Sequence, residues 1–340
     1  MGRATVYNRF YSPEIWAKVN TENLDLVRDY LEYLKSIDRA PSTIEQYEND
    51  LRIFMCWNYE NNKNKLFTEL TKREIAKFQY TALNEYQWSS NRIRRFKSVL
   101  SSFSTYIENI LDDEYDGYRS IVNKIANPVN EPVREKTVFK DGEIEELIDS
   151  LRDEGKYPQM IALALALYSG RRKQELLRYR MDFFTEDNVI HGSLYKTPKI
   201  KTKGHGAKGK VINTYVLKNK FDPYLEVWRK YREENGIESE WLLYDANNPS
   251  QPMAVSTLDS WANIFSRRLG KPFYWHSLRH KWTTAMAEAG LPTDVIQTLQ
   301  SWASADMVSV YNDRDVDDVL AEYFNESGIV AKAATTLDKI

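Results

Sequence analysis

The chain has little cysteine, no long apolar run and almost no net charge. Cys56 is its single cysteine among 340 residues, which excludes an internal disulfide and suits a reducing compartment. The longest apolar run, residues 160–168, is too short to cross a membrane. The first residues lack the apolar segment of a signal peptide. We therefore expect a cytoplasmic protein with no membrane partner.

The charge balance restricts how the chain can contact nucleic acid. Its 47 basic and 49 acidic residues give a net charge of −2, which argues against coating nucleic acid through bulk charge. Local basic patches are present instead. Residues 92–97 contain three arginines and a lysine, and residues 196–210 contain six lysines and no acidic residue. For both segments, a solvated basic surface is the ordinary alternative to a binding face.

The first part of the chain has the pattern of a small helical bundle. Apolar residues recur at helical spacing in four segments, and Thr71 with Glu74 has the spacing of a capping box that would begin the third. We assign residues 21–111 to this bundle. Residues 1–20 lack a clear period and are expected to form a flexible N-terminal arm. Two prolines and a polar composition indicate a linker over residues 112–137.

The rest of the chain predicts a second domain over residues 138–325, followed by a tail over residues 326–340. Residues 160–168 are apolar on nearly all sides, so this helix should be central and buried. Residues 189–195 and 211–217 have the composition of strands, and glycines between them supply turns. The expected fold class is mainly α with a small β-sheet: an N-terminal helical bundle and an α+β second domain.

Polar motifs of the second domain lie in three separate pieces. Arg172 lies two residues beyond the glycine that ends the apolar helix. His276 and Arg279 are three residues apart, so they share one face of a helix or of its entry turn. Trp302 precedes Tyr311 by nine residues. A His-x-x-Arg pair alone is a weak sign of a phosphate site, and the other pieces are equally weak alone.

In their order along the chain, these pieces resemble the tyrosine recombinase (lambda integrase) family. The family pattern is Gly-x-Arg-x-x-Glu, a lysine on a β-hairpin, His-x-Leu-Arg-His, then His or Trp, and a tyrosine nine residues further on. All six positions can be filled here, and the resemblance extends from about residue 23 to about residue 324. It implies a site-specific DNA recombinase that acts through a 3′-phosphotyrosyl intermediate.

The resemblance also implies an organisation and a set of partners. The bundle would be the family's core-binding domain, the second domain its catalytic domain, and the tail would dock into a neighbouring subunit. The two domains would encircle double-stranded DNA, and a homotetramer would act on two target sites through a Holliday junction, for integration, excision or resolution. Accessory DNA-bending or directionality proteins belong to the expected partners, a nucleoid-associated location follows, and no cofactor is implied.

Each catalytic role in the family then has a candidate residue. Tyr311 would attack as the nucleophile. Arg172 and Arg279 would hold non-bridging phosphate oxygens, since guanidinium groups pair with phosphate in bidentate fashion. His276 would be the acid/base partner near the tyrosine. Trp302, where many relatives have histidine, can donate one hydrogen bond but cannot titrate.

The hairpin lysine and the DNA contacts are indicated by the basic patches. Lys203 precedes a glycine and fits the family's hairpin lysine, which would protonate the leaving oxygen; Lys201 and Lys208 are alternatives. Phosphate contacts from basic side chains position DNA without reading its sequence. The residues expected to contact DNA are Arg92, Arg94, Arg95, Lys97, Lys201 and Lys208.

Supporting residues flank the catalytic candidates. Glu175 would orient Arg172 or His276, and His280 would serve packing or hydrogen bonding. Arg171 fills a position where the family commonly has an apolar residue. The departure leaves open which of the two adjacent arginines enters the pocket.

Other function classes fit the sequence less well. His276 and His280 have a spacing that can bind zinc, but Ser277 stands where the metalloprotease motif needs glutamate, so no metal is expected. A Ser/His/Asp hydrolase would need a Gly-x-Ser-x-Gly elbow, which the sequence lacks. A catalytically inactive DNA-binding protein of the same fold and a type IB topoisomerase-like enzyme stay open as alternatives.

Overall fold

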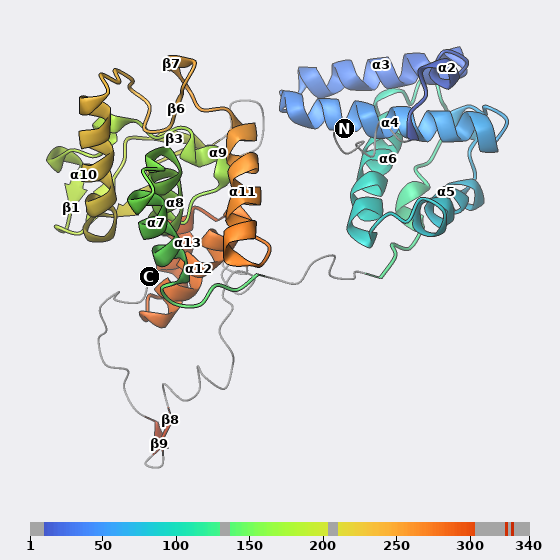
Figure 1. Ribbon diagram of the computed structural model, residues 1–340. Coiled ribbons are helices and arrows are strands. Elements are labelled where there is room, and N and C mark those ends of the chain that lie inside the picture. Colours follow the sequence, from blue (N-terminus) through green and yellow to red (C-terminus); the bar gives the residue numbers. More distant parts are fainter. Residues whose placement is uncertain (1–9, 130–136, 203–209, 303–323, 326–327, 330–340) are drawn as a thin grey trace. The chain divides into compact units, whose positions relative to one another are not determined.

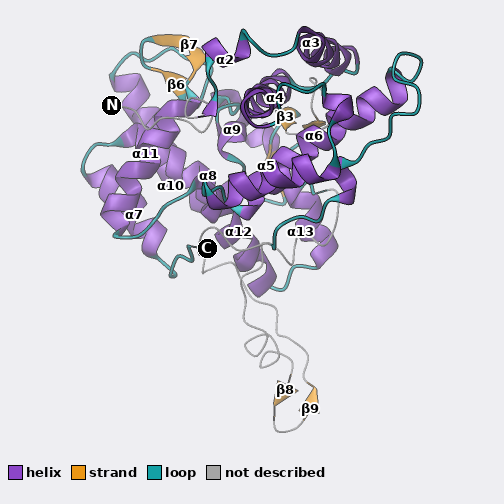
Figure 2. Cartoon of the chain, turned by 90° about the vertical axis from the view of Figure 1, so that its right-hand side faces the viewer, coloured by secondary structure: helices purple, strands orange, loops and turns teal. Residues whose placement is uncertain are grey.

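In the computed structural model, residues 10–129, 137–202, 210–302, 324–325 and 328–329 are described. The chain divides into two compact units, one up to residue 135 and one from residue 136 onward, apart from a short segment within 203–209 that lies outside the described residues. Helices make up most of the described chain, and strands are confined to short elements (Figure 2). The predicted fold class is confirmed: mainly α with small sheets.

The first unit consists of helices around one aromatic-rich core. Its elements are α2 (Pro13–Trp16), α3 (Thr21–Ser36), α4 (Pro41–Asn61), η1 (Phe67–Glu69), α5 (Lys72–Asn84), α6 (Ser90–Ile110) and η2 (Val122–Lys124). Phe54 and Phe78 stack edge to face with ring centroids 5.3 Å apart, and both are buried. The predicted capping box is confirmed, because Thr71 accepts from the backbone N–H of Glu74 and Glu74 accepts from that of Thr71.

Two segments outside the regular helical pattern also pack onto this unit. Trp16 of α2 lies against the core, although it falls in the segment predicted as a flexible arm. Val122 is 1% exposed and Tyr118 shares a hydrogen bond of 2.6 Å with Ser104 of α6, although both fall in the predicted linker. These described parts of the expected arm and linker therefore pack onto the first unit. Single aromatic and apolar side chains dock here without the periodicity that would have marked them.

The helices of the second unit surround α8 (Tyr157–Ser169). The other helices are α7 (Glu143–Asp153), α9 (Lys173–Leu176), η3 (Met181–Phe183), η4 (Glu186–Asn188), α10 (Lys218–Glu234), α11 (Val255–Leu269), α12 (Trp275–Glu288) and α13 (Thr293–Gln300). Residues 160–169 are all buried, and α8 packs against α7, α10 and α12 (Figure 1). The prediction of a central apolar helix is confirmed. The end of α8 is thereby held by neighbours on several sides.

Short antiparallel strands complete the second unit. They are β1 (Val189–Ile190), β2 (Leu194–Lys196), β3 (Ile200–Thr202), β4 (Lys210–Ile212), β5 (Tyr215–Leu217), β6 (Tyr244–Asp245), β7 (Asn248–Pro252), β8 (Phe324–Asn325) and β9 (Gly328–Ile329). The sheets have the orders β1-β2-β5, β3-β4, β6-β7 and β8-β9. No helix among the described residues is long and apolar enough to cross a membrane.

The prediction of one strand over residues 189–195 was wrong, because the segment folds into the β1-β2 hairpin. His191 and Gly192 both have positive φ, at 53° and 67°, and form its tight turn. Residues 211–217 are likewise divided between β4 and β5, which belong to different sheets. A histidine in the left-handed region is uncommon, so the sequence contained no strong turn signal.

Candidate active site

Gly170 ends α8 and begins the corner that carries the first polar motif. Its φ of +60° lies in the left-handed region that favours glycine. A Cβ atom added at Gly170 would lie 2.6 Å from Nε2 of Gln300 and 2.8 Å from Cγ of Trp282. The motif therefore requires glycine both for its backbone conformation and for the close approach of α12 and α13.

Arg172 and Glu175 form one hydrogen-bonded pair just beyond this corner. Glu175 is 2% exposed and accepts from the Arg172 backbone N–H at 3.3 Å and from its Nη1 at 3.1 Å. The Arg172 side chain is 31% exposed. Glu175 thus contacts one of the two partners that the sequence suggested for it. A buried carboxylate thus holds a guanidinium that stays partly exposed.

Arg279 of α12 joins three parts of the motif. It is fully buried, and its Nη1 donates to the backbone oxygen of Gly170 at 2.9 Å. Its Nη2 donates to the backbone oxygen of Gln300, also at 2.9 Å, and its guanidinium lies 5.0 Å from the centre of the Trp302 ring. The pieces that carry Arg172, Arg279 and Trp302 are therefore brought together.

His276 and His280 lie on the first two turns of α12. Their ring centroids are 5.5 Å apart at 83°. Desolvation, and then the positive charges of His280, Arg279 and Arg172, lower the pKa of His276 to about 4. The His276 side chain still reaches solvent. At neutral pH it is therefore an accessible, uncharged imidazole.

Trp302 is positioned by the end of α13. The helix closes with a left-handed Ser301 at φ 58°, a hydrogen bond from the Trp302 N–H to the Gln297 oxygen and one from the Ser301 N–H to the Thr298 oxygen, each 3.0 Å. This pair of bonds is the Schellman motif. Trp302 is 6% exposed, and its ring lies over Arg279.

The two adjacent arginines have different environments. Arg171 is 1% exposed, and its Nη2 donates to the backbone oxygen of Leu299. Arg172 is partly exposed beside Glu175. The structure thus favours Arg172 as the arginine that can reach a ligand, which is the residue selected by the family spacing.

The β3-β4 hairpin carries Lys201, one of the candidate lysines. Lys201 lies on β3 opposite Val211, with its side chain exposed between the buried Ile200 and Thr202. Arg178, just after α9, donates from Nη1 to the Lys201 backbone oxygen. The hairpin is therefore attached next to the Arg172 motif. Three predicted residues lie outside the described residues: Lys203, Lys208 and Tyr311.

The family model described as Phage integrase family matches residues 137–317. The chain belongs to the phage integrase family. The prediction of a tyrosine recombinase is thereby confirmed, and the chain is a tyrosine-type site-specific recombinase by class.

Named relatives of this integrase family are distant in sequence. An SPbeta prophage-derived recombinase-like protein, YomM, of Bacillus subtilis (strain 168) is 26% identical over 254 residues, covering 74% of this chain and 73% of the relative. A tyrosine recombinase of Thermosipho africanus (strain TCF52B) is 23% identical over 297 residues, covering 85% and 93%.

Solved structures share the fold. XerH site-specific recombinase bound to palindromic difH substrate, in a post-cleavage complex, gives a TM-score of 0.61 at 17% identity, covering 82% of this chain and 78% of that one. A lambda integrase tetramer bound to a Holliday junction gives 0.60 at 15% identity, covering 86% and 78%.

Two of the basic residues expected at the DNA face of this integrase instead bind groups of their own unit. Arg92 binds Asp50 in bidentate fashion at 2.9 and 2.5 Å. Lys97 is 7% exposed and donates from Nζ to the Ile125 oxygen at 2.6 Å, and burial lowers the pKa of its amine. We correct both to residues that hold the first unit together. Arg95, with a side chain 55% exposed, keeps its expected role as a prediction.

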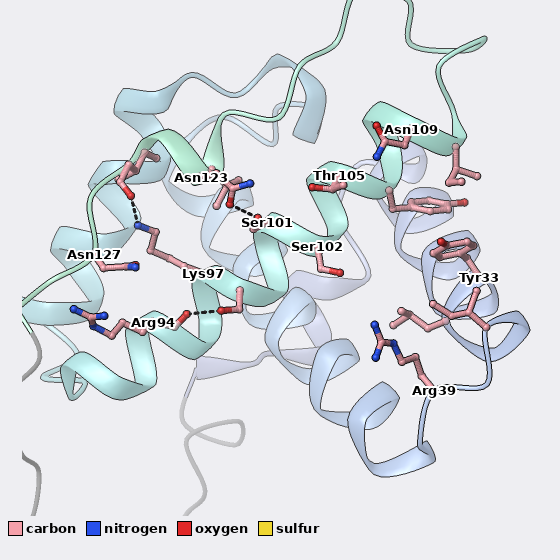
Figure 3. A pocket seen from close by; sticks show the side chains of 17 residues that line it. Tyr33, Arg39, Arg94, Lys97, Ser101, Ser102, Thr105, Asn109, Asn123 and Asn127 are labelled. Carbon is pink, nitrogen blue, oxygen red and sulfur yellow. Dashed lines mark hydrogen bonds between the residues drawn. The ribbon is translucent and has the colours of Figure 1, made fainter. Parts of the chain in front are cut away.

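Arg94 lines a hollow beside α6 in the same unit of the integrase (Figure 3). Arg39 and Lys97 also line it, and no acidic residue does. The uncharged polar residues around it are Ser98, Ser101, Ser102, Thr105, Asn109, Asn123 and Asn127. Sequence reasoning missed Arg39, which is a single basic residue in the loop between α3 and α4 and forms no patch along the chain.

Metal ligation has no support in the described part of the integrase. Among those residues, no group of three or more His, Cys, Asp or Glu side chains could hold a metal ion. The rings of His276 and His280 are in edge contact, and the described residues place no third ligand of these types with them.

Proposed function

We propose that this recombinase cleaves and rejoins double-stranded DNA at specific sites through a 3′-phosphotyrosyl intermediate, with Tyr311 as the nucleophile. One observation carries the proposal. Arg279 bonds to the backbone of Gly170 and of Gln300, residues 109 and 21 positions away, so that the motif pieces meet at one corner. The tyrosine follows the last of these pieces after nine residues.

The proposed step forms and breaks one bond each. The Tyr311 phenol oxygen attacks the phosphorus, the bond from phosphorus to the 5′ oxygen breaks, and a free 5′ hydroxyl leaves. His276 accepts the phenol proton, since its neutral imidazole is available at pH 7. Lys203 gives a proton to the 5′ oxygen, with Lys201 and Lys208 as alternatives. Attack by a 5′ hydroxyl from another strand reverses the step and joins the strands.

Charge on the phosphate would be stabilised by the arginines. Arg172 is partly exposed, and Glu175 fixes its orientation, which suits bidentate binding of two non-bridging oxygens. Arg279 is buried with its Nη groups on the Gly170 and Gln300 oxygens, so it would turn one of them toward the phosphate to contribute the second guanidinium, and Trp302 would donate from its indole N–H. Preorganised donors of this kind supply the largest share of the rate in many enzymes. His280 supports His276, and no metal or cofactor takes part in the proposed step.

DNA binding would use both units. We propose residues 21–111 as the core-binding domain, residues 138–325 as the catalytic domain, and residues 326–340 as the tail exchanged between subunits. Arg39, Arg94 and Arg95 would contact phosphates from the first unit. The lambda integrase neighbour is a tetramer bound to a Holliday junction. The same assembly on two target sites is proposed here, with accessory DNA-bending or directionality proteins as further partners at the nucleoid.

A nicked duplex tests the proposed chemistry. DNA from the genomic neighbourhood of the gene is first screened for binding. A nick on the 3′ side of the candidate cleavage point lets the short fragment with the free 5′ hydroxyl diffuse away and traps the covalent complex. Wild type should form a complex that survives a denaturing gel, and Tyr311→Phe should form none. Tight binding without a covalent complex from either protein would support an inactive DNA-binding protein. Relaxation of supercoiled DNA without strand exchange would support the topoisomerase alternative.

A further inference from the structure

Arg171 is a buried cation to which the proposed chemistry assigns no role. It is 1% exposed, and its Nη2 donates to the backbone oxygen of Leu299. Within the described residues, its buried Nε and Nη1 groups have no hydrogen-bond partner. Desolvation by burial lowers the pKa of its guanidinium. Arg171, next to Arg172 in the motif, is therefore a charged group buried away from water.

Arg171 bonds to the C-terminal end of α13, the helix that is followed by Trp302. In the last turn of α13, the Schellman motif uses the carbonyls of Gln297 and Thr298. The next two carbonyls, of Leu299 and Gln300, have no partner within the helix at its end. Arg171 binds the first and Arg279 binds the second. Both cations lie at the negative end of the helix dipole, which favours them.

Stability alone does not account for this arginine. A buried guanidinium with unpaired N–H groups destabilises a fold relative to an apolar side chain that fills the same space. An apolar residue commonly occupies this position in the family pattern. A directional bond from Arg171, however, fixes where the α13 end lies relative to the corner that carries Arg172. Apolar contact is not directional and would leave that position less restricted.

We propose that Arg171 is a positioning residue for DNA cleavage. It holds the last turn of α13, and with it Trp302, against the corner that carries Arg172. It touches no substrate, so its loss should slow the cleavage step and leave DNA affinity unchanged. The inference rests on the proposed function.

The test compares Arg171→Met, which keeps an unbranched apolar side chain but removes every donor, with Arg171→Lys, which keeps a donor. Arg232→Met is the matched control, because Arg232 is also buried, at 6%, and binds the backbone oxygens of Trp241 and Ser239 away from the site. For each protein we would measure single-turnover cleavage of the nicked duplex at saturating protein, the Kd for that duplex, and the thermal unfolding midpoint.

Arg171→Met should cleave roughly tenfold to a hundredfold more slowly, since small misplacements of catalytic groups have effects of this size. Its Kd should stay within about threefold of wild type, and Arg171→Lys should recover part of the rate. Arg232→Met should lose thermal stability and cleave at the wild-type rate. Cleavage by Arg171→Met at the wild-type rate, or a rate loss matched by the control, would overturn the inference and assign Arg171 to packing.

A double variant covers the case in which Arg171→Met folds poorly. If Arg171 acts through Trp302, the double variant Arg171→Lys, Trp302→Phe should lose a smaller factor in cleavage rate than the product of the factors lost by the two single variants. Independent losses would overturn the inference. Failure of wild type to cleave would instead overturn the proposed function. The inference about Arg171 is judged from the variants relative to a wild type that cleaves, so the two failures can be told apart.

Discussion

Gly170→Ala should strongly destabilise the second unit, because two effects act at one atom. Placing alanine in the left-handed region costs about 1–2 kcal/mol. The added Cβ would also lie 2.8 and 2.9 Å from Cγ and Cδ2 of Trp282, and 2.6 Å from Nε2 of Gln300. Trp282 is 3% exposed and Gln300 is fully buried, so neither can move away freely. Overpacking of this kind costs about 1–3 kcal/mol more.

The expected total loss is therefore about 2–5 kcal/mol in the free energy of unfolding. Gly236→Ala is the matched control, since Gly236 has φ of +61° but no atom within 4 Å of an added Cβ. The control should lose only the conformational part, about 1–2 kcal/mol. Urea denaturation followed by circular dichroism compares the two variants with wild type. Equal losses in both variants would refute the close packing of Gly170 against α12 and α13.

Three further predictions follow from the contacts of single residues. The pKa of His276 is lowered from 6.5 to about 4, so the unfolded chain binds the proton more tightly than the folded chain. The contribution of this group to the free energy of unfolding should be full above pH 6.5 and decline as pH falls toward 4. His276→Asn should remove part of that decline in thermal melts. Glu175→Gln should slow DNA cleavage about tenfold or more with little change in circular dichroism, because Arg172 loses its anionic partner; an unchanged rate would argue against orientation of Arg172. Asp50→Ala should cost the first unit about 3–5 kcal/mol in urea denaturation, because Asp50 is 3% exposed and its loss leaves Arg92 unpaired.

Sequence alone predicted features that depend on local order along the chain. The helix over residues 160–168 is apolar on all sides, and burial of that whole surface follows directly. The Thr71 capping box needs only two side chains three residues apart. The spacing of the catalytic motif identified the family, because its order does not depend on how the pieces meet in space.

Features that depend on distant partners were not predictable in this way. Asp50 lies 42 residues from Arg92, and the Ile125 carbonyl lies 28 residues from Lys97, so two basic residues expected at a DNA face have partners within the first unit. The bond from Arg171 to Leu299 spans 128 residues and has no signature in either segment. The role of Gly170 in close packing likewise appears only once α12 and α13 are in place.

The most direct test of the proposed function is to identify the protein–DNA bond itself. The covalent complex formed on a nicked duplex would be digested with trypsin and nuclease, and the modified peptide sequenced by mass spectrometry. The proposal predicts a nucleotide joined through its 3′ phosphate to Tyr311, with a free 5′ hydroxyl on the released fragment. Attachment to another tyrosine, or linkage through a 5′ phosphate, would contradict it.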